Sequence, residues 1–159
     1  MQELDLKIIN GTIANATETF YSDIGIKDGL IVSIGKNIGE AKRVIDAAGK
    51  FVLPGGIEAH CHIEQESSGG IMTSDDYYSG SVSAAFGGNT CFIPFAAQHR
   101  GQKLHDVLEL YHSRAKPKSV IDYSFHLIIS DPSDEVINQE LPNVIEQGIT
   151  SFKIYMTYD

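Results

Sequence analysis

The sequence predicts an α/β fold in two parts: a small antiparallel sheet over residues 1–53, then the first half of a TIM-like (β/α)8 barrel over residues 54–159. The first part has short alternating segments separated by turn signals such as Asn10-Gly11 and Asp28-Gly29, which is typical of antiparallel strands. After Pro54 the pattern changes to strand, helix, strand, helix. This alternation predicts parallel βα units.

Each part can be divided into expected elements from its apolar periodicity. In the first part, strands are expected at residues 4–9, 12–14, 23–26 and 30–34, with residues 44–46 and 49–53 extending the sheet. In the second part, strands are expected at residues 57–63, 90–96, 120–129 and 149–156. Four strands are half of a closed barrel, which needs eight strands and about 250 residues. The chain is therefore expected to be an amino-terminal fragment with an exposed edge at its last strand.

Three helices are expected between the barrel strands, at residues 75–86, 102–115 and 133–147. Thr73, with Asp76 three residues later, is the expected start signal of the first helix. The second helix has an apolar face at helical spacing, formed by Leu104, Val107, Leu108 and Tyr111. Pro142 is expected to interrupt the third helix, because proline lacks a backbone N–H.

The composition favours an ordinary globular protein. Apolar residues make up 42% of the 159 residues, and 12 basic against 21 acidic residues give a net charge of −9. This acidic balance argues against nucleic acid or an anionic membrane as a partner. The chain has no apolar run of the roughly 20 residues that a membrane span needs, and its start lacks the features of a signal peptide. We therefore expect a cytoplasmic protein in which Cys61 and Cys91 are buried free thiols.

Two histidines, His60 and His62, stand one residue apart at the end of the first expected barrel strand. In a strand, residues i and i+2 project from the same face, so both imidazoles can face one ion while Cys61 points the other way. Zinc normally takes four ligands, so at least one more must come from elsewhere. A polar, glycine-rich loop over residues 65–70 follows, at the strand end where active sites of parallel α/β folds lie. A His-x-His pair alone is also typical of a strand with two partly exposed histidines.

Three segments together resemble the dihydropyrimidinase and hydantoinase family of cyclic amidohydrolases, within the binuclear-metal amidohydrolase superfamily. The segments are the His60-Cys61-His62 stretch, residues 73–90, and residues 152–158, which contain Lys153 and Tyr158. The resemblance covers nearly the whole chain. Two positions depart from the family's usual residues: Glu58 replaces an aspartate and Cys61 replaces a common threonine.

The resemblance implies a metal-dependent hydrolase barrel preceded by part of a β-sandwich. It implies hydrolysis of a cyclic amide bond in a dihydropyrimidine, hydantoin or related imide by the full-length parent. The implied cofactors are two divalent metal ions, expected to be zinc, held by His60, His62 and Lys153. Lysine as an ammonium has no lone pair for a cation, and in the family it is carboxylated so that a carbamate bridges the two ions. Without that modification, Lys153 would be a strand-end lysine reaching solvent.

Tyr158 is the catalytic residue that the resemblance implies, as a donor to the oxyanion formed on the ring carbonyl. The family takes its remaining ligands from later strands, so the 159-residue chain is expected to be inactive by itself. The expected partners are a small cyclic amide or imide and, for the full-length enzyme, further copies in a homotetramer. His126 is interpreted as a barrel histidine whose ring nitrogens are satisfied within the fold.

Two other functions fit parts of the pattern. A dihydroorotase or allantoinase uses similar metal strands, but a dihydroorotase usually has an arginine two residues after the second histidine, where Glu64 stands. A non-enzymatic scaffold protein of the same fold would have lost metal ligands. His60, His62 and Lys153 are all present, which favours the enzyme.

Overall fold

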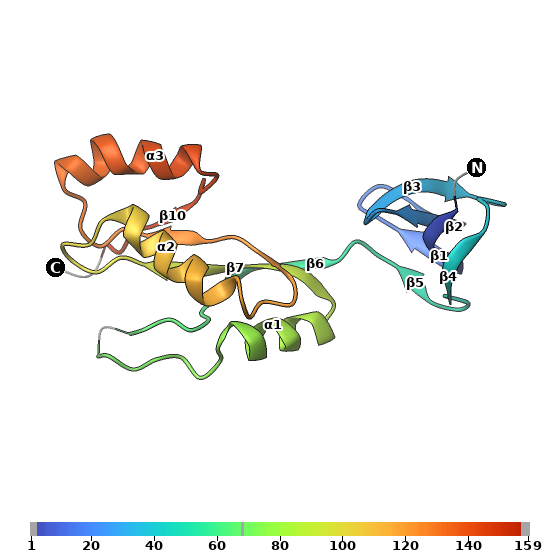
Figure 1. Cartoon of the computed structure of the whole chain (residues 1–159), viewed down its shortest axis with the longest axis horizontal. Coiled ribbons are helices and arrows are strands. Elements are labelled where there is room, and N and C mark those ends of the chain that lie inside the picture. The colour runs from blue at the N-terminus through green and yellow to red at the C-terminus, as the bar shows by residue number, and fades with distance from the viewer. Residues whose placement is uncertain (1–2, 68, 157–159) are drawn as a thin grey trace. The chain divides into compact units, whose positions relative to one another are not determined.

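The computed structural model describes residues 3–67 and 69–156, which form two compact units, one ending at Pro54 and the other beginning at Gly55 (Figure 1). In the described residues, no helix is both long and apolar enough to cross a lipid bilayer.

The first unit is a five-stranded mixed sheet. Its strands are β1 (Leu4–Ala14), β2 (Thr19–Lys27), β3 (Leu30–Gly35), β4 (Ala41–Asp46) and β5 (Phe51–Val52). The order is β3-β2-β1-β4, and β5 also pairs with β1. β2 and β3 pair antiparallel as predicted, but β4 and β5 run parallel to β1. The prediction of a purely antiparallel sheet was wrong because alternation reports which face is buried and does not specify strand direction.

The two turn signals of this unit have different outcomes. Asp28 and Gly29 have positive φ angles of 51° and 76° and join β2 to β3, which confirms the predicted hairpin. Asn10-Gly11 lies inside β1, where the pairing with β2 shifts register and Asn10 has a φ of 62°. The pair therefore forms a bulge, and the predicted turn there was wrong. A Cβ at Gly11 would lie 2.6 Å from a methyl carbon of Val52, so this close approach requires glycine.

The second unit contains a parallel sheet of β6 (Gly56–Cys61), β7 (Asn89–Ala97), β8 (Asp122–Tyr123), β9 (His126–Ile128) and β10 (Phe152–Lys153). The order along the sheet is β6-β7-β9-β10, with β8 also paired to β7, which confirms the predicted parallel order. The expected strand at 120–129 is divided into β8 and β9, which keep one register along β7. β10 is shorter than expected, because only Phe152 and Lys153 pair with β9.

Helices α1 (Tyr77–Phe86) and α2 (Leu104–Ala115) follow β6 and β7. Asp76 caps α1 by accepting a 2.8 Å hydrogen bond from the Ser79 N–H, while the Asp76 N–H donates to Ser79 Oγ. The start predicted at Thr73 was wrong, because this reciprocal capping box lies three residues later.

The apolar face predicted for α2 is confirmed, since Leu104, Val107, Leu108 and Tyr111 are all buried. The expected third helix is divided into a π-helical turn, η1 (Val136–Glu140), and α3 (Leu141–Glu146). Pro142 lies in the first turn of α3. Glu140 and Leu141 keep helical φ and ψ angles, so the predicted interruption takes the form of a change from π-helical to α-helical hydrogen bonding and not of a break in the helix.

The core of the second unit lies between the sheet and these helices. Its fully buried members come from both layers, and the largest are Tyr77, Phe92, Leu104, Phe125 and Leu127. Burying a side chain of this size contributes about 1.5–3 kcal/mol. This packing holds the strands against the helices, and their carboxyl ends lie along one rim of the sheet.

Candidate metal centre

His60 and His62 lie on one face at the carboxyl end of β6. Their ring centroids are 5.7 Å apart, and both rings are exposed. The pairing of β6 with β7 is irregular between Glu58 and Cys61, yet the two imidazoles stay on the same side. The strand therefore presents both rings together, as alternation predicts.

Cys61 points away from the two histidines and packs against the core of the second unit. Its burial, with a smaller contribution from the Glu58 carboxylate, raises the pKa of the Cys61 thiol to about 11. At neutral pH the sulfur is therefore a protonated thiol. Since its side chain packs against the core, the packing role expected for this residue is confirmed.

The ring nitrogens of the two histidines differ in their partners. His62 Nδ1 lies 2.6 Å from Gln65 Oε1, which leaves Nε2 available. The ring nitrogens of His60 make no hydrogen bond within the described residues, and its backbone N–H donates to Glu58 Oε1 at 2.9 Å. Each imidazole therefore has at least one nitrogen that can face a cation.

Phe95 of β7 lies beneath both histidines and is only 4% exposed. Its ring centroid is 4.9 Å from that of His60 and 4.9 Å from that of His62, with which it stacks. Lys153 Nζ lies 4.3 Å from the same centroid. One phenyl ring on the neighbouring strand is therefore the shared floor of the predicted ligands from β6 and β10.

Lys153 lies on β10, opposite Ile128 of β9, and its side chain is partly buried. Its ammonium also lies 5.1 Å from the ring of Tyr155, and no carboxylate in residues 3–67 and 69–156 forms an ion pair with it. The lysine thus reaches over the sheet toward the two histidines. Tyr158, the predicted catalytic residue, lies outside the described residues.

The side chains on this rim are of the kind that bind a divalent cation, but the described residues provide too few of them to complete its coordination. Neutral imidazole nitrogen is a preferred zinc ligand, and two such rings share one face. In the described part of the chain, no three His, Cys, Asp or Glu side chains come together as a cation site. A four-coordinate ion here would therefore need ligands beyond His60 and His62.

His126 of β9 bridges three strands of the sheet. Its Nε2–H donates to the backbone oxygen of Ala59 in β6 at 2.8 Å, and its Nδ1 accepts from the hydroxyl of Ser151, next to β10. The ring also lies 5.1 Å from that of Phe95. Both ring nitrogens are thus satisfied by the fold, which confirms the interpretation of His126 as a structural histidine.

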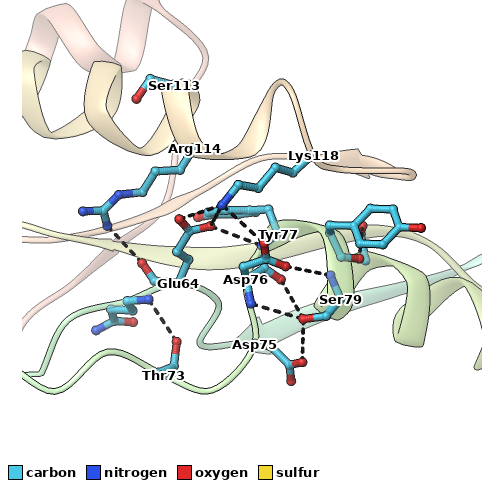
Figure 2. A network of polar contacts seen from close by, with 12 residues as sticks. Glu64, Thr73, Asp75, Asp76, Tyr77, Ser79, Ser113, Arg114 and Lys118 are labelled. Atoms are coloured by element: carbon cyan, nitrogen blue, oxygen red, sulfur yellow. Dashed lines mark hydrogen bonds and ion pairs between the residues drawn. The ribbon is translucent and has the colours of Figure 1, made fainter.

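Glu64 anchors the turn after β6 to the helices (Figure 2). Its carboxylate contacts Lys118 Nζ at 2.8 and 2.9 Å and accepts a hydrogen bond from the Tyr77 N–H at 3.3 Å. Lys118 also contacts Asp76 at 3.3 Å. Hydrogen bonding to Glu64 raises the pKa of Lys118. Glu64 therefore faces the start of α1 and the residues after α2.

A groove of about 1030 Å³ lies at the carboxyl ends of the strands. Its walls come from the segments that follow β6, β7 and β9 and from β10, and include Gln65, Gln98, Arg100, Ser130 and Tyr155. Gln98 is buried, and its Oε1 accepts from the N–H groups of Ser130 and Asp131. The groove adjoins the histidine pair through Gln65, the partner of His62.

Comparison with known proteins identifies the family. No family model matches the chain. It is 48% identical over 153 residues to a D-hydantoinase of Geobacillus stearothermophilus, covering 95% of this chain and 32% of that protein. A D-hydantoinase of Ralstonia pickettii is 44% identical over 155 residues, covering 98% and 34%. One solved D-hydantoinase structure matches with a TM-score of 0.93 at 44% identity, over 98% of this chain and 34% of that one. The chain belongs to the D-hydantoinase and dihydropyrimidinase family.

A solved dihydropyrimidinase from Brevibacillus agri NCHU1002 also matches, with a TM-score of 0.90 and 41% identity, over 96% of this chain and 33% of that one. The chain spans about a third of the length of the curated hydantoinases it matches. The partial barrel and the mixed sheet are therefore a segment of the hydantoinase fold.

The sequence did not point to Phe95, Gln65 or the role of Glu64 in this member of the hydantoinase family. Phe95 is one of several apolar residues in an expected strand, and its contact with the two histidines depends on the register of β6 against β7. The one available signal was its position near the end of the strand that follows the histidine strand. Gln65 and Glu64 lie in a turn whose geometry no local pattern specifies.

Proposed function

We propose that this chain is the part of a cyclic amidohydrolase that supplies the histidine strand and the lysine strand of its metal site. The substrate class is a dihydropyrimidine, hydantoin or related cyclic imide. The observation that carries the proposal is the convergence of His60, His62 and Lys153 around the ring of Phe95. The similarity to D-hydantoinases over nearly the whole chain also supports the proposal.

In this proposal the imidazoles of His60 and His62 hold one divalent ion, and zinc suits their chemistry. Lys153 joins the site as a carboxylated lysine, because the ammonium has no lone pair for a cation and a carbamate supplies anionic oxygen ligands. Metal ions bound there would polarise the ring carbonyl and make water a stronger nucleophile. Tyr158 donates to the oxygen of the ring carbonyl as negative charge develops on it.

The alternatives fit less well. A dihydroorotase would need a cationic side chain at the position of Glu64 to hold the carboxylate of its substrate. Glu64 is itself a carboxylate, and it binds Lys118. A non-enzymatic scaffold protein would have lost its metal ligands, whereas His60, His62 and Lys153 are present and lie around Phe95. Both observations favour a hydantoinase-type enzyme.

A chimaera tests the proposal. In the D-hydantoinase of Geobacillus stearothermophilus, the segment that matches this chain is replaced by the chain itself. We expect the chimaera to bind zinc and to open a hydantoin ring, because the chain supplies the same strands and ligands. Hydantoin and dihydrouracil hydrolysis and metal content are measured. A folded, zinc-loaded chimaera that opens neither ring would contradict the proposal, and one that opens dihydroorotate alone would favour the dihydroorotase reading.

A further inference from the structure

The Gln65 side chain lies against one ring nitrogen of His62. His62 Nδ1 and Gln65 Oε1 are 2.6 Å apart. The amide oxygen can only accept, so the ring nitrogen donates. A neutral imidazole protonated at Nδ1 has its lone pair at Nε2. The contact therefore selects the tautomer in which Nε2 is free to bind a cation.

Gln65 is held in place by backbone hydrogen bonds on both sides. Its N–H donates to Thr73 Oγ1 at 3.0 Å, and its carbonyl accepts from the Thr73 N–H at 3.0 Å. Its side chain is partly buried. The backbone of Gln65 is thus fixed next to His62.

Glu64 holds the same turn from the other side (Figure 2). Its carbonyl accepts from Arg114 Nη1 at 2.9 Å, and its N–H donates to Asp75 O at 2.9 Å. Its φ of 44° is in the left-handed region, which is strained for a non-glycine residue and persists only where surrounding contacts enforce it. The carboxylate bonds to Lys118 are such contacts. The turn is therefore constrained in the geometry that directs Gln65 at His62.

We propose that Gln65 is a positioning residue that sets the tautomer and ring orientation of His62 for metal binding. The inference rests on the proposed function, in which His62 is a ligand. Ligating histidines commonly donate their second ring N–H to an oxygen acceptor, and losing that acceptor typically weakens metal affinity 10–100-fold. Gln65 supplies that acceptor from the same turn that lines the groove.

The test compares Gln65→Leu with the unaltered 159-residue chain. Nitrogen-15 NMR on histidine-labelled, metal-free protein, at a pH where the rings are neutral, reports the tautomer of His62. We expect the Nδ1–H tautomer in the unaltered chain and a mixture in Gln65→Leu. Zinc affinity, measured by competition with a chelator, should fall about 10-fold or more. Gln65→Glu, which keeps an acceptor, should restore the Nδ1–H tautomer.

Gln139→Leu is the matched control, because it makes the same replacement at an exposed position on η1. It should change neither readout. A Gln65→Leu chain that keeps the Nδ1–H tautomer, or loses it with unchanged zinc affinity, overturns the inference. Zinc affinity that His62→Ala also leaves unchanged would instead overturn the ligand assignment of the proposed function. The tautomer measurement separates these failures because it uses no metal.

Discussion

Replacing His60 or His62 by alanine in the hydantoinase chimaera should remove bound metal and ring-opening activity together. These two imidazoles share one face of β6, with centroids 5.7 Å apart, and no third His, Cys, Asp or Glu side chain in the described residues joins them as a cation site. The loss of one therefore leaves this strand with a single donor. Removing only an outer partner of a ligand costs 10–100-fold in affinity, so we expect a loss of more than about 100-fold here.

Cys61→Ala is the matched control, since the sulfur lies between the two histidines in sequence but packs into the core. It should keep its metal and most of its activity, at a cost of about 1 kcal/mol in stability for the lost packing. Zinc content and hydantoin hydrolysis are measured on the three variants. A Cys61→Ala protein that loses metal as severely as His60→Ala would show that the side-chain assignment on β6 is wrong.

Phe95→Ala should destabilise the 159-residue chain by about 3–5 kcal/mol. The ring is 4% exposed and contacts the rings of His60, His62 and His126 and the ammonium of Lys153. Alanine would leave a cavity beneath the whole rim, and the residues above could only partly fill it. Urea denaturation followed by circular dichroism gives the change in the free energy of unfolding.

Phe86→Ala provides the control, because the side chain of Phe86 is 91% exposed at the end of α1. Its effect should stay within about 0.5 kcal/mol. Equal destabilisation by the two substitutions would contradict the role of Phe95 as the floor of the site. A Phe95→Leu variant, which keeps much of the volume, should recover much of the stability.

The parts of the fold predictable from sequence were those with long periodic signals. The apolar face of α2 and the parallel order of β6, β7, β9 and β10 follow from spacing over many residues and from the preference of βα units for neighbouring positions. The direction of β4 and β5 and the bulge at Asn10 do not follow. An Asn-Gly pair favours a hairpin turn but also fits a bulge, and the pairing of β1 with β2 decides between them.

The candidate site was also only partly predictable from the sequence. His60 and His62 were predictable because alternation within one strand sets their common face. Their partners come from other segments: Phe95 depends on the register between strands, and Gln65 depends on a turn constrained by Glu64, Thr73 and Arg114. Contacts between residues distant in sequence leave no local pattern.

Metal analysis with intact-mass measurement on the 159-residue chain tests most directly whether β6 and β10 supply a partial metal site. The residues interpreted as metal ligands in the described part of the chain are His60, His62 and Lys153, whereas two ions need ligands around both. Without two cations to stabilise a carbamate, Lys153 should remain an ammonium over Phe95. We predict at most one weakly held equivalent of zinc, abolished by His60→Ala, and the mass of an unmodified chain. Two tightly held equivalents with a carboxylated lysine would contradict the account.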